Sequence, residues 1–368
     1  MNSVPIEPRI TEYLYRKAAF AGVPLSGTFE LTPLCNMNCK MCYVKLSEKE
    51  QKAAGELRTA VEWIALAKEL KNEGMLYLLL TGGEPLLRRD FREIFAGLRR
   101  LGLLLSVNTN GYLMDDEMIE FFAKNPPLRL NISLYGTSNE AYEKLCGVPA
   151  FDRVLDNVRK LKTAGIQVKL NSSITPYNCD DIPGMYRVAE ELGVPLKATS
   201  YMFPPVRVNG CKFGEAPHRF MPEEAAQIML TCREQYLTAE QLSRSWIDAP
   251  DDDECADGTG DRMRCRAGKS AFWVTYDGRM LPCGMFPWEG HKISEVGFDE
   301  AWKATRADCE KIMMPAKCSS CAYKDRCTAC AASCITETGR SDAVPEYICT
   351  MTKTLERLTA EKYGRAED

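Results

Sequence analysis

A repeated pattern of apolar runs constrains the fold of this chain more than any other feature. Between residues 26 and 202, short apolar runs are each followed by a polar turn and an amphipathic stretch. Several runs are nearly continuous in Leu, Val and Ile, as in strands covered on both faces. The stretches carry apolar side chains at helical spacing. The pattern predicts β–α units forming a parallel sheet with helices outside, either a barrel or an open sheet. The runs cover residues 27–34, 75–82, 103–110, 128–136, 166–174 and 195–202.

The pattern stops after residue 202. Residues 222–244 read as one long helix, and an acidic, glycine-bearing stretch follows it. Further on, Asp277-Gly278 lies between two apolar segments, which predicts a β-hairpin. The expected organisation is an N-terminal extension (1–25), a core (26–215), a linker helix with an acidic loop (216–254), a cysteine-rich domain (255–350) and a C-terminal helix (351–368).

The chain contains 17 cysteines but only two histidines. Its N-terminus lacks the profile of a signal peptide, so we expect a cytoplasmic protein whose thiols stay reduced. With 368 residues the chain can bury a large core and needs no disulfides. Clustered cysteines in that compartment usually bind metal, and the scarcity of histidine leaves zinc or iron–sulfur.

Two classes of partner are not expected. The net charge of −4 gives no electrostatic case for binding nucleic acid. The longest apolar runs are far too short to cross a bilayer, so no membrane association is predicted.

The first cysteine cluster has the form CxxxCxxC and follows the first predicted strand directly. It comprises Cys35, Cys39 and Cys42. Loops at the carboxyl ends of parallel strands build active sites. Three thiolates are one too few for a closed structural site, whereas a 4Fe–4S cluster held by three cysteines keeps one iron open. A zinc site completed by a distant fourth ligand is the alternative.

The second predicted strand ends in Gly82-Gly83-Glu84-Pro85. Glycines without side chains let a ligand approach the backbone, whose carbonyl groups can accept hydrogen bonds from an ammonium group. The alternative is an ordinary turn before the next helix.

Together, the two motifs resemble those of the radical S-adenosylmethionine (SAM) enzymes, over residues 26–202. The resemblance implies a partial (β/α)6 TIM-type barrel, a catalytic cluster on the CxxxCxxC cysteines, and a GGEP segment that holds the SAM amino group. By the same resemblance, Ser133 matches a serine that contacts SAM, and Asn108 lies at another SAM-facing strand end. The residue before the third cysteine is usually aromatic in the family. Here it is Met41, and Tyr43 follows as a cofactor-binding candidate.

The C-terminal cysteines resemble those of the SPASM extension, which carries two auxiliary clusters. The resemblance implies three 4Fe–4S clusters in all, one of which binds SAM. One spacing departs from the family pattern, so either Cys330 or Cys334 is the crossing ligand, and Cys330 is favoured. Zinc ribbons are the alternative for the paired cysteines. The implied outer ligands are Cys318, Cys321, Cys327 and Cys349; the implied inner ligands are Cys265, Cys283, the crossing cysteine and Cys255.

The resemblance implies an oxidoreductase that cleaves SAM reductively to a 5′-deoxyadenosyl radical. The radical would abstract a hydrogen atom from a peptide or protein substrate, leading to a crosslink or an epimer. A flavodoxin- or ferredoxin-type donor would supply the electron. Gly284 stands where the sulfatase-maturing branch carries an aspartate base, which disfavours formylglycine formation. No catalytic acid or base stands out. The alternatives are a small-molecule or tetrapyrrole precursor as substrate, and a non-catalytic zinc or iron–sulfur protein.

Overall fold

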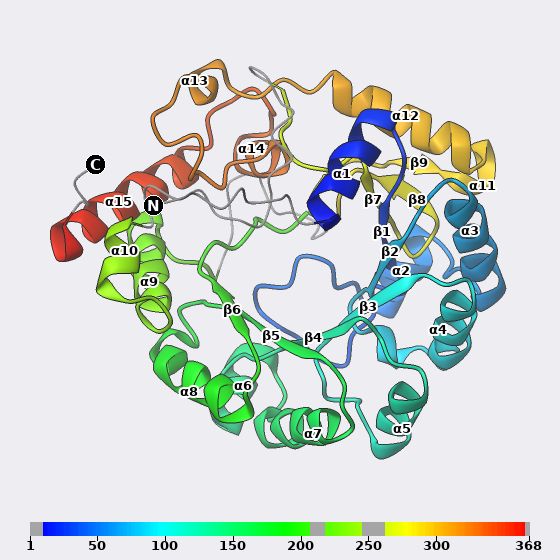
Figure 1. Cartoon of the computed structure of the whole chain (residues 1–368), viewed down its shortest axis with the longest axis horizontal. Coiled ribbons are helices and arrows are strands. Elements are labelled where there is room, and N and C mark those ends of the chain that lie inside the picture. The colour runs from blue at the N-terminus through cyan, green and yellow to red at the C-terminus, as the bar shows by residue number, and fades with distance from the viewer. Residues whose placement is uncertain (1–9, 207–217, 245–261, 365–368) are drawn as a thin grey trace, which may run out of the picture.

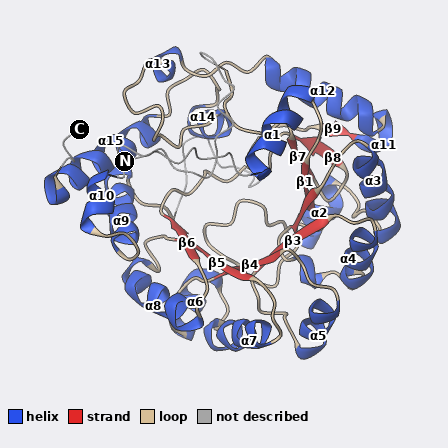
Figure 2. Cartoon of the chain, viewed as in Figure 1, coloured by secondary structure: helices blue, strands red, loops and turns tan. Residues whose placement is uncertain are grey.

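The computed structural model describes residues 10–206, 218–244 and 262–364. Its centre is a nine-stranded sheet in the order β6-β5-β4-β3-β2-β1-β7-β8-β9. The first six strands are parallel and lie in chain order, as the apolar runs predict, and the sheet curves into a partial barrel with helices outside (Figures 1 and 2). These strands are β1 (Ser26–Glu30), β2 (Tyr77–Thr81), β3 (Leu104–Thr109), β4 (Arg129–Ser133), β5 (Val168–Ser173) and β6 (Leu196–Thr199).

The helices begin and end where local chemistry favours it. For example, Thr59 and Glu62 form a reciprocal capping box at the start of α3, and Gly193 ends α8 in the left-handed conformation. Their apolar stripes face the sheet; Trp63 of α3 is fully buried and packs on Phe29 of β1. The helices up to β6 are α1 (Ile10–Ala21), α2 (Glu48–Ala54), α3 (Ala60–Asn72), η1 (Pro85–Leu87), α4 (Phe91–Arg100), α5 (Asp116–Lys124), α6 (Asn139–Cys146), α7 (Phe151–Thr163), η2 (Cys179–Asp181) and α8 (Ile182–Leu192).

The C-terminal part extends the same sheet. β7 (Ala271–Val274) pairs in parallel with β1, and the turn at Asp277-Gly278 joins it to β8 (Arg279–Leu281), which confirms the predicted hairpin. The pairing of β7 with β1 is not evident from the sequence. β9 (His291–Lys292) completes the sheet, and the remaining helices are α11 (Ile293–Val296), α12 (Phe298–Glu310), α13 (Ala316–Ser319), α14 (Ala331–Thr338) and α15 (Glu346–Tyr363).

The expectation of one long helix over 222–244 is wrong. The chain forms α9 (Pro222–Glu234) and then α10 (Ala239–Arg244). The break has a local cause, because Thr238 and Gln241 cap each other: the Thr238 amide donates to the Gln241 side chain and the Gln241 amide donates to the Thr238 hydroxyl. A new helix therefore starts after Thr238.

Helices α9 and α15 pack together beside β6, at one end of the sheet (Figure 1). The C-terminal helix thereby covers the side of the barrel that the strands leave open. Within the described residues, no helix combines the length and the apolar character needed to span a bilayer.

Candidate functional site

The loop that follows β1 carries the first three cysteines and is held by backbone contacts. The amides of Asn38 and Lys40 donate to the carbonyl oxygens of Cys146 and Leu145, at 2.8 and 3.0 Å, at the end of α6. The Lys45 ammonium donates to the Met37 carbonyl at 2.8 Å. These contacts fix the path of the loop at the carboxyl end of the strands.

The thiols of Cys35, Cys39 and Cys42 all line one cavity of about 540 Å³. The Cys35 sulfur accepts hydrogen bonds from the Met37 amide and the Asn110 side-chain amide, at 3.4 and 3.7 Å. Burial raises the pKa of the Cys35 thiol to about 12 and also raises the pKa of the Cys42 thiol. A cationic partner in the cavity would therefore be needed to hold these sulfurs as thiolates.

The GGEP segment lies between the cysteine loop and β3 and contacts both. Glu84 is fully buried, and its carboxylate accepts hydrogen bonds from the Leu86 amide, the Thr109 hydroxyl and the Asn110 amide. Burial raises its pKa to about 7, against the lowering effect of these three donors. Glu84 thus joins the end of β2 to the end of β3, a role that the sequence did not indicate. Pro85 follows at the start of η1.

The glycines are required by a close approach of protein backbone. A Cβ atom at Gly82 would lie 2.2 Å from the Thr32 carbonyl oxygen, and one at Gly83 would lie 2.3 Å from that of Leu34. The Gly83 amide donates to the Thr32 carbonyl at 2.7 Å. The segment that leads into Cys35 therefore packs directly on the glycines.

We expect Gly83→Ala to displace the cysteine loop, because the added methyl group meets backbone that cannot rotate away. Overpacking of this kind costs roughly 1–3 kcal/mol of folding free energy. Denaturant titration measures the free energy of unfolding, and iron analysis after anaerobic reconstitution measures the iron bound. Both quantities should be lower in the variant than in the wild type. The matched control is Gly165→Ala, where no atom lies within 4 Å of the added methyl group and the strain comes only from a φ of +77°. Equal iron content in Gly83→Ala and the wild type would contradict the idea that the packing of Gly83 on Leu34 positions the cysteine loop.

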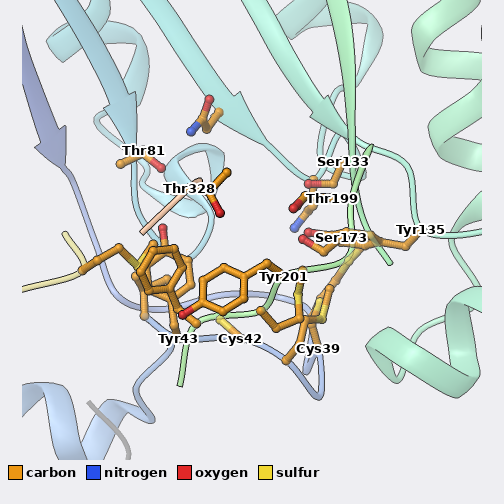
Figure 3. Close-up of a pocket in the computed structure, with 18 of the residues that line it drawn as sticks. Cys39, Cys42, Tyr43, Thr81, Ser133, Tyr135, Ser173, Thr199, Tyr201 and Thr328 are labelled. Atoms are coloured by element: carbon orange, nitrogen blue, oxygen red, sulfur yellow. The ribbon is translucent and has the colours of Figure 1, made fainter. Parts of the chain in front are cut away.

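The structure brings five of the seven predicted cofactor residues to the same cavity. Gly82, Gly83, Asn108, Ser133 and Tyr43 line it together with the cysteines. Glu84 and Pro85 lie behind this wall and are buried. Figure 3 shows Cys39, Cys42, Tyr43 and Tyr201 along one side of the cavity and Ser133, Ser173 and Thr199, from neighbouring strand ends, along another.

The donor set fits an iron–sulfur cluster. The three thiols come from one short loop and face one cavity, and thiolates are the ligands that such clusters prefer. The side-chain amide nitrogen of the neighbouring Asn36 is buried and has no hydrogen-bond partner. A polar group beside Cys35 therefore remains without a hydrogen bond. Among the described residues, no three Cys, His, Asp or Glu side chains converge tightly enough to hold a single metal ion.

The C-terminal cysteines form two neighbouring groups. Cys265, Cys283 and Cys330 pack around one small apolar core, and burial raises the pKa of the Cys283 thiol to about 12, with Cys265 and Cys330 adding to the shift. In the second group, Cys318 and Cys327 raise the pKa of the Cys349 thiol further than burial alone does. Cys334 is fully buried, near Cys330 of the first group and near this second group. The Cys321 sulfur accepts the Tyr323 amide, and Cys255 lies outside the described residues.

The sequence did not point to several residues of the cavity. Arg233, on α9, and Arg326, between two cysteines, both line it. Cys146 is buried against Cys39, and the contact of the two thiols raises the pKa of Cys39. The neighbouring strand ends offered a signal for Thr109 and Ser173. The two arginines reach the cavity through long-range contacts between helices and the barrel, and such contacts leave no signal in the local sequence.

Comparisons with known proteins agree with this fold. Residues 29–189 match the radical SAM superfamily. An AdoMet-dependent heme synthase from Methanosarcina barkeri is 28% identical over 338 residues, which cover 87% of this chain and 95% of that protein. The structure resembles that of Streptococcus suis SuiB bound to its precursor peptide SuiA (TM-score 0.66, 17% identity, 95% of this chain and 83% of that one). It also resembles anSMEcpe with bound AdoMet and the Cp18Cys peptide (TM-score 0.68, 17% identity, 92% and 97%).

Proposed function

Residues 29–189 form a radical SAM domain, and from this premise we propose that the protein is an oxidoreductase that abstracts a hydrogen atom from a peptide or protein substrate. The observation that carries the proposal is the convergence of Cys35, Cys39 and Cys42 with the strand-end residues on one cavity. A 4Fe–4S cluster on these cysteines would supply reductive cleavage of SAM to a 5′-deoxyadenosyl radical.

The residues of the chain would position the cysteine loop, bind SAM and hold the auxiliary clusters. Asn110, through its contacts to Cys35 and Asn36, orients the cysteine loop. Gly82, Gly83, Asn108, Ser133 and Tyr43 would hold SAM, whose amino group needs acceptors such as backbone carbonyls. The C-terminal cysteines would hold two auxiliary clusters. The packing of Cys330 with Cys265 and Cys283 around one apolar core supports Cys330 as the crossing ligand of the inner cluster.

Support for a peptide substrate comes from SuiB and anSMEcpe, whose structures contain bound peptides. Formylglycine formation stays disfavoured on physical grounds. A Cβ atom at Gly284 would lie 2.9 Å from the Trp273 ring. The Trp273 indole is itself held by a hydrogen bond to Glu30. An aspartate base therefore has no room at this position without displacement of Trp273.

A tetrapyrrole or another small molecule is the second candidate substrate. The observation that favours it is the similarity to the heme synthase along almost the whole of both chains. Anaerobic incubation with SAM, a reductant and either candidate peptides or tetrapyrroles separates the two, with substrate mass as the readout. A loss of two hydrogens from a peptide supports the first candidate, and a mass change confined to the tetrapyrrole supports the second.

The same preparation tests whether the protein is an enzyme at all. A brown protein that contains iron and forms 5′-deoxyadenosine after reduction fits the proposal. A colourless protein that contains zinc and leaves SAM intact would instead be a metal-binding protein without this activity.

A further inference from the structure

One side chain, that of Thr352, belongs both to the cavity wall and to the surroundings of the C-terminal cysteines. Thr352 lies on α15 and lines the cavity. Its hydroxyl donates a hydrogen bond to the Cys327 sulfur, at 3.7 Å, a separation that suits the large sulfur atom. Cys327 is one of the cysteines proposed for the outer auxiliary cluster. The same hydroxyl therefore borders the cavity and contacts a candidate cluster ligand.

The loop that carries Cys327 also reaches the cavity. Arg326 and Thr328, the residues on either side of Cys327, both line it, and Figure 3 shows Thr328 among the side chains around the cavity. The backbone at Cys327 therefore runs along the cavity wall. The cysteines proposed for the outer cluster adjoin the cavity on this side and do not lie apart from it.

Helix α15 presents a second cysteine to the same loop. Cys349 and Thr352 are three residues apart on α15, a spacing that places side chains on one face of a helix. Burial raises the pKa of the Cys349 thiol, and the nearby Cys327 raises it further. The donor set fits an iron–sulfur cluster, because thiols from the helix and from the loop approach one another and thiolates are the ligands that such clusters prefer.

The hydrogen bond from Thr352 has an electronic consequence if Cys327 binds a cluster. A cluster-bound cysteine has lost its proton and can only accept hydrogen bonds. Thr352 is buried, so water competes little for this acceptor. A donor at the sulfur stabilises the reduced cluster, which carries one more negative charge than the oxidised cluster, and such donors are among the determinants of the reduction potential.

We infer that Thr352 is a positioning residue that raises the reduction potential of a 4Fe–4S cluster on the outer cysteines, and that it does so from the wall of the cavity. The inference rests on the proposed function for the presence of this cluster. It deepens that proposal by naming the residue that tunes the cluster and by placing the cluster beside the cavity. A zinc ion on the same cysteines would have no reduction potential to tune.

Thr359, on the same helix, provides a matched control. Like Thr352 it is a buried threonine, but its hydroxyl donates to the Leu355 carbonyl of its own helix, at 2.8 Å, and it does not line the cavity. Replacement of either threonine by valine removes one hydroxyl and keeps the branched shape of the side chain. Only the replacement at Thr352 removes a hydrogen bond from a cysteine sulfur.

The test is a potentiometric titration of the anaerobically reconstituted full-length protein, followed by electron paramagnetic resonance. In Thr352→Val we expect the midpoint potential of one cluster to fall. Its equilibrium constant for reduction should be roughly tenfold lower, a change of about 59 mV for a one-electron couple. Thr352→Ser keeps a hydroxyl and should retain most of the wild-type midpoint. Thr359→Val should leave every midpoint unchanged.

Cysteine variants identify the cluster whose midpoint moves. Joint replacement of Cys318 and Cys321 by alanine should remove its signal, whereas joint replacement of Cys265 and Cys283 should leave that signal in place. Metal analysis of the wild type should find iron and no zinc.

Several results would overturn the inference. One is a set of midpoints in Thr352→Val equal to those of the wild type. Others are an equal fall in Thr359→Val, a fall in Thr352→Ser as large as in the valine variant, and a moved signal that is lost with Cys265 and Cys283. Zinc in place of iron at the outer cysteines would overturn it as well.

Failure of the proposed function gives a different signature. It would appear as absence of 5′-deoxyadenosine from reduced wild-type protein, whatever the midpoint potentials are. A cluster on the outer cysteines can still be titrated in that case, so the two results are read independently.

Discussion

Simultaneous replacement of Cys35, Cys39 and Cys42 by alanine should reduce 5′-deoxyadenosine formation to background, a loss of about a thousandfold or more. The three thiols are the donors that face the cavity from the loop after β1, and a cluster bound through fewer of them would be lost. Liquid chromatography of quenched anaerobic reactions, with SAM and dithionite, measures the product. Iron content should fall by the iron of one cluster and not to zero, because the C-terminal cysteines are untouched.

The matched control is Cys179→Ala. Cys179 is a half-buried cysteine of η2 that does not line the cavity. It should form 5′-deoxyadenosine at the wild-type rate. Product formation by the triple alanine variant at a comparable rate would show that the catalytic cluster, if there is one, is bound elsewhere in the chain.

Replacement of Glu337 by alanine should cost about 3–5 kcal/mol of folding free energy, the range for breaking a buried ion pair from one side. The Arg219 and Glu337 side chains are only 8% and 4% exposed, and two hydrogen bonds join them at 2.6 and 3.0 Å. The Tyr201 hydroxyl also donates to Glu337, at 2.8 Å. Truncation would leave the guanidinium buried without its carboxylate.

This ion pair connects parts of the chain that are far apart in sequence. Tyr201 follows β6 and lines the cavity, Glu337 belongs to α14, and the Arg219 guanidinium lies 3.9 Å from the ring centroid of Tyr347 in α15. Burial, and then the Glu337 carboxylate, raise the pKa of Tyr201, so its hydroxyl stays protonated and donates a hydrogen bond to Glu337. Loss of the pair should therefore loosen the C-terminal cysteine region from the barrel.

Guanidinium chloride titration followed by tryptophan fluorescence measures the change. Asp342→Ala is the control, because the Arg340–Asp342 pair is exposed (72% and 46%) and the solvent screens pairs of that kind, so they add little to the folding free energy. Glu337→Gln should lose less than Glu337→Ala, since it keeps a hydrogen-bond acceptor. A Glu337→Ala variant as stable as Asp342→Ala would contradict the structural role of the pair.

The barrel could be predicted from the sequence because its signals are local. Each apolar run and each amphipathic stretch is recognisable within some ten residues, and right-handed β–α units allow few arrangements. The cysteine loop and the GGEP segment were predicted to share a site for the same reason, since they end adjacent strands. Their mutual packing was not predicted, because the contact between Gly83 and Leu34 depends on backbone geometry.

The C-terminal part was harder to predict because the arrangement of its strands and helices depends on long-range contacts. The Asp277-Gly278 hairpin is a local signal and is confirmed, whereas the pairing of β7 with β1 joins residues far apart in the chain. The break before α10 did have a signal, the Thr238–Gln241 capping box, which the apolar spacing of the segment obscured. Arg233 and Arg326 reach the cavity only through the packing of α9, α15 and the cysteine-rich loops.

The central claim is that the cluster on Cys35, Cys39 and Cys42 leaves one iron open to SAM. Electron paramagnetic resonance of the dithionite-reduced protein, recorded before and after addition of SAM, tests it most directly. We expect SAM to shift the g-values of one cluster signal, and we expect that signal to be absent from the triple alanine variant. A wild-type spectrum that SAM leaves unchanged, in a protein with a full complement of iron, would contradict the account.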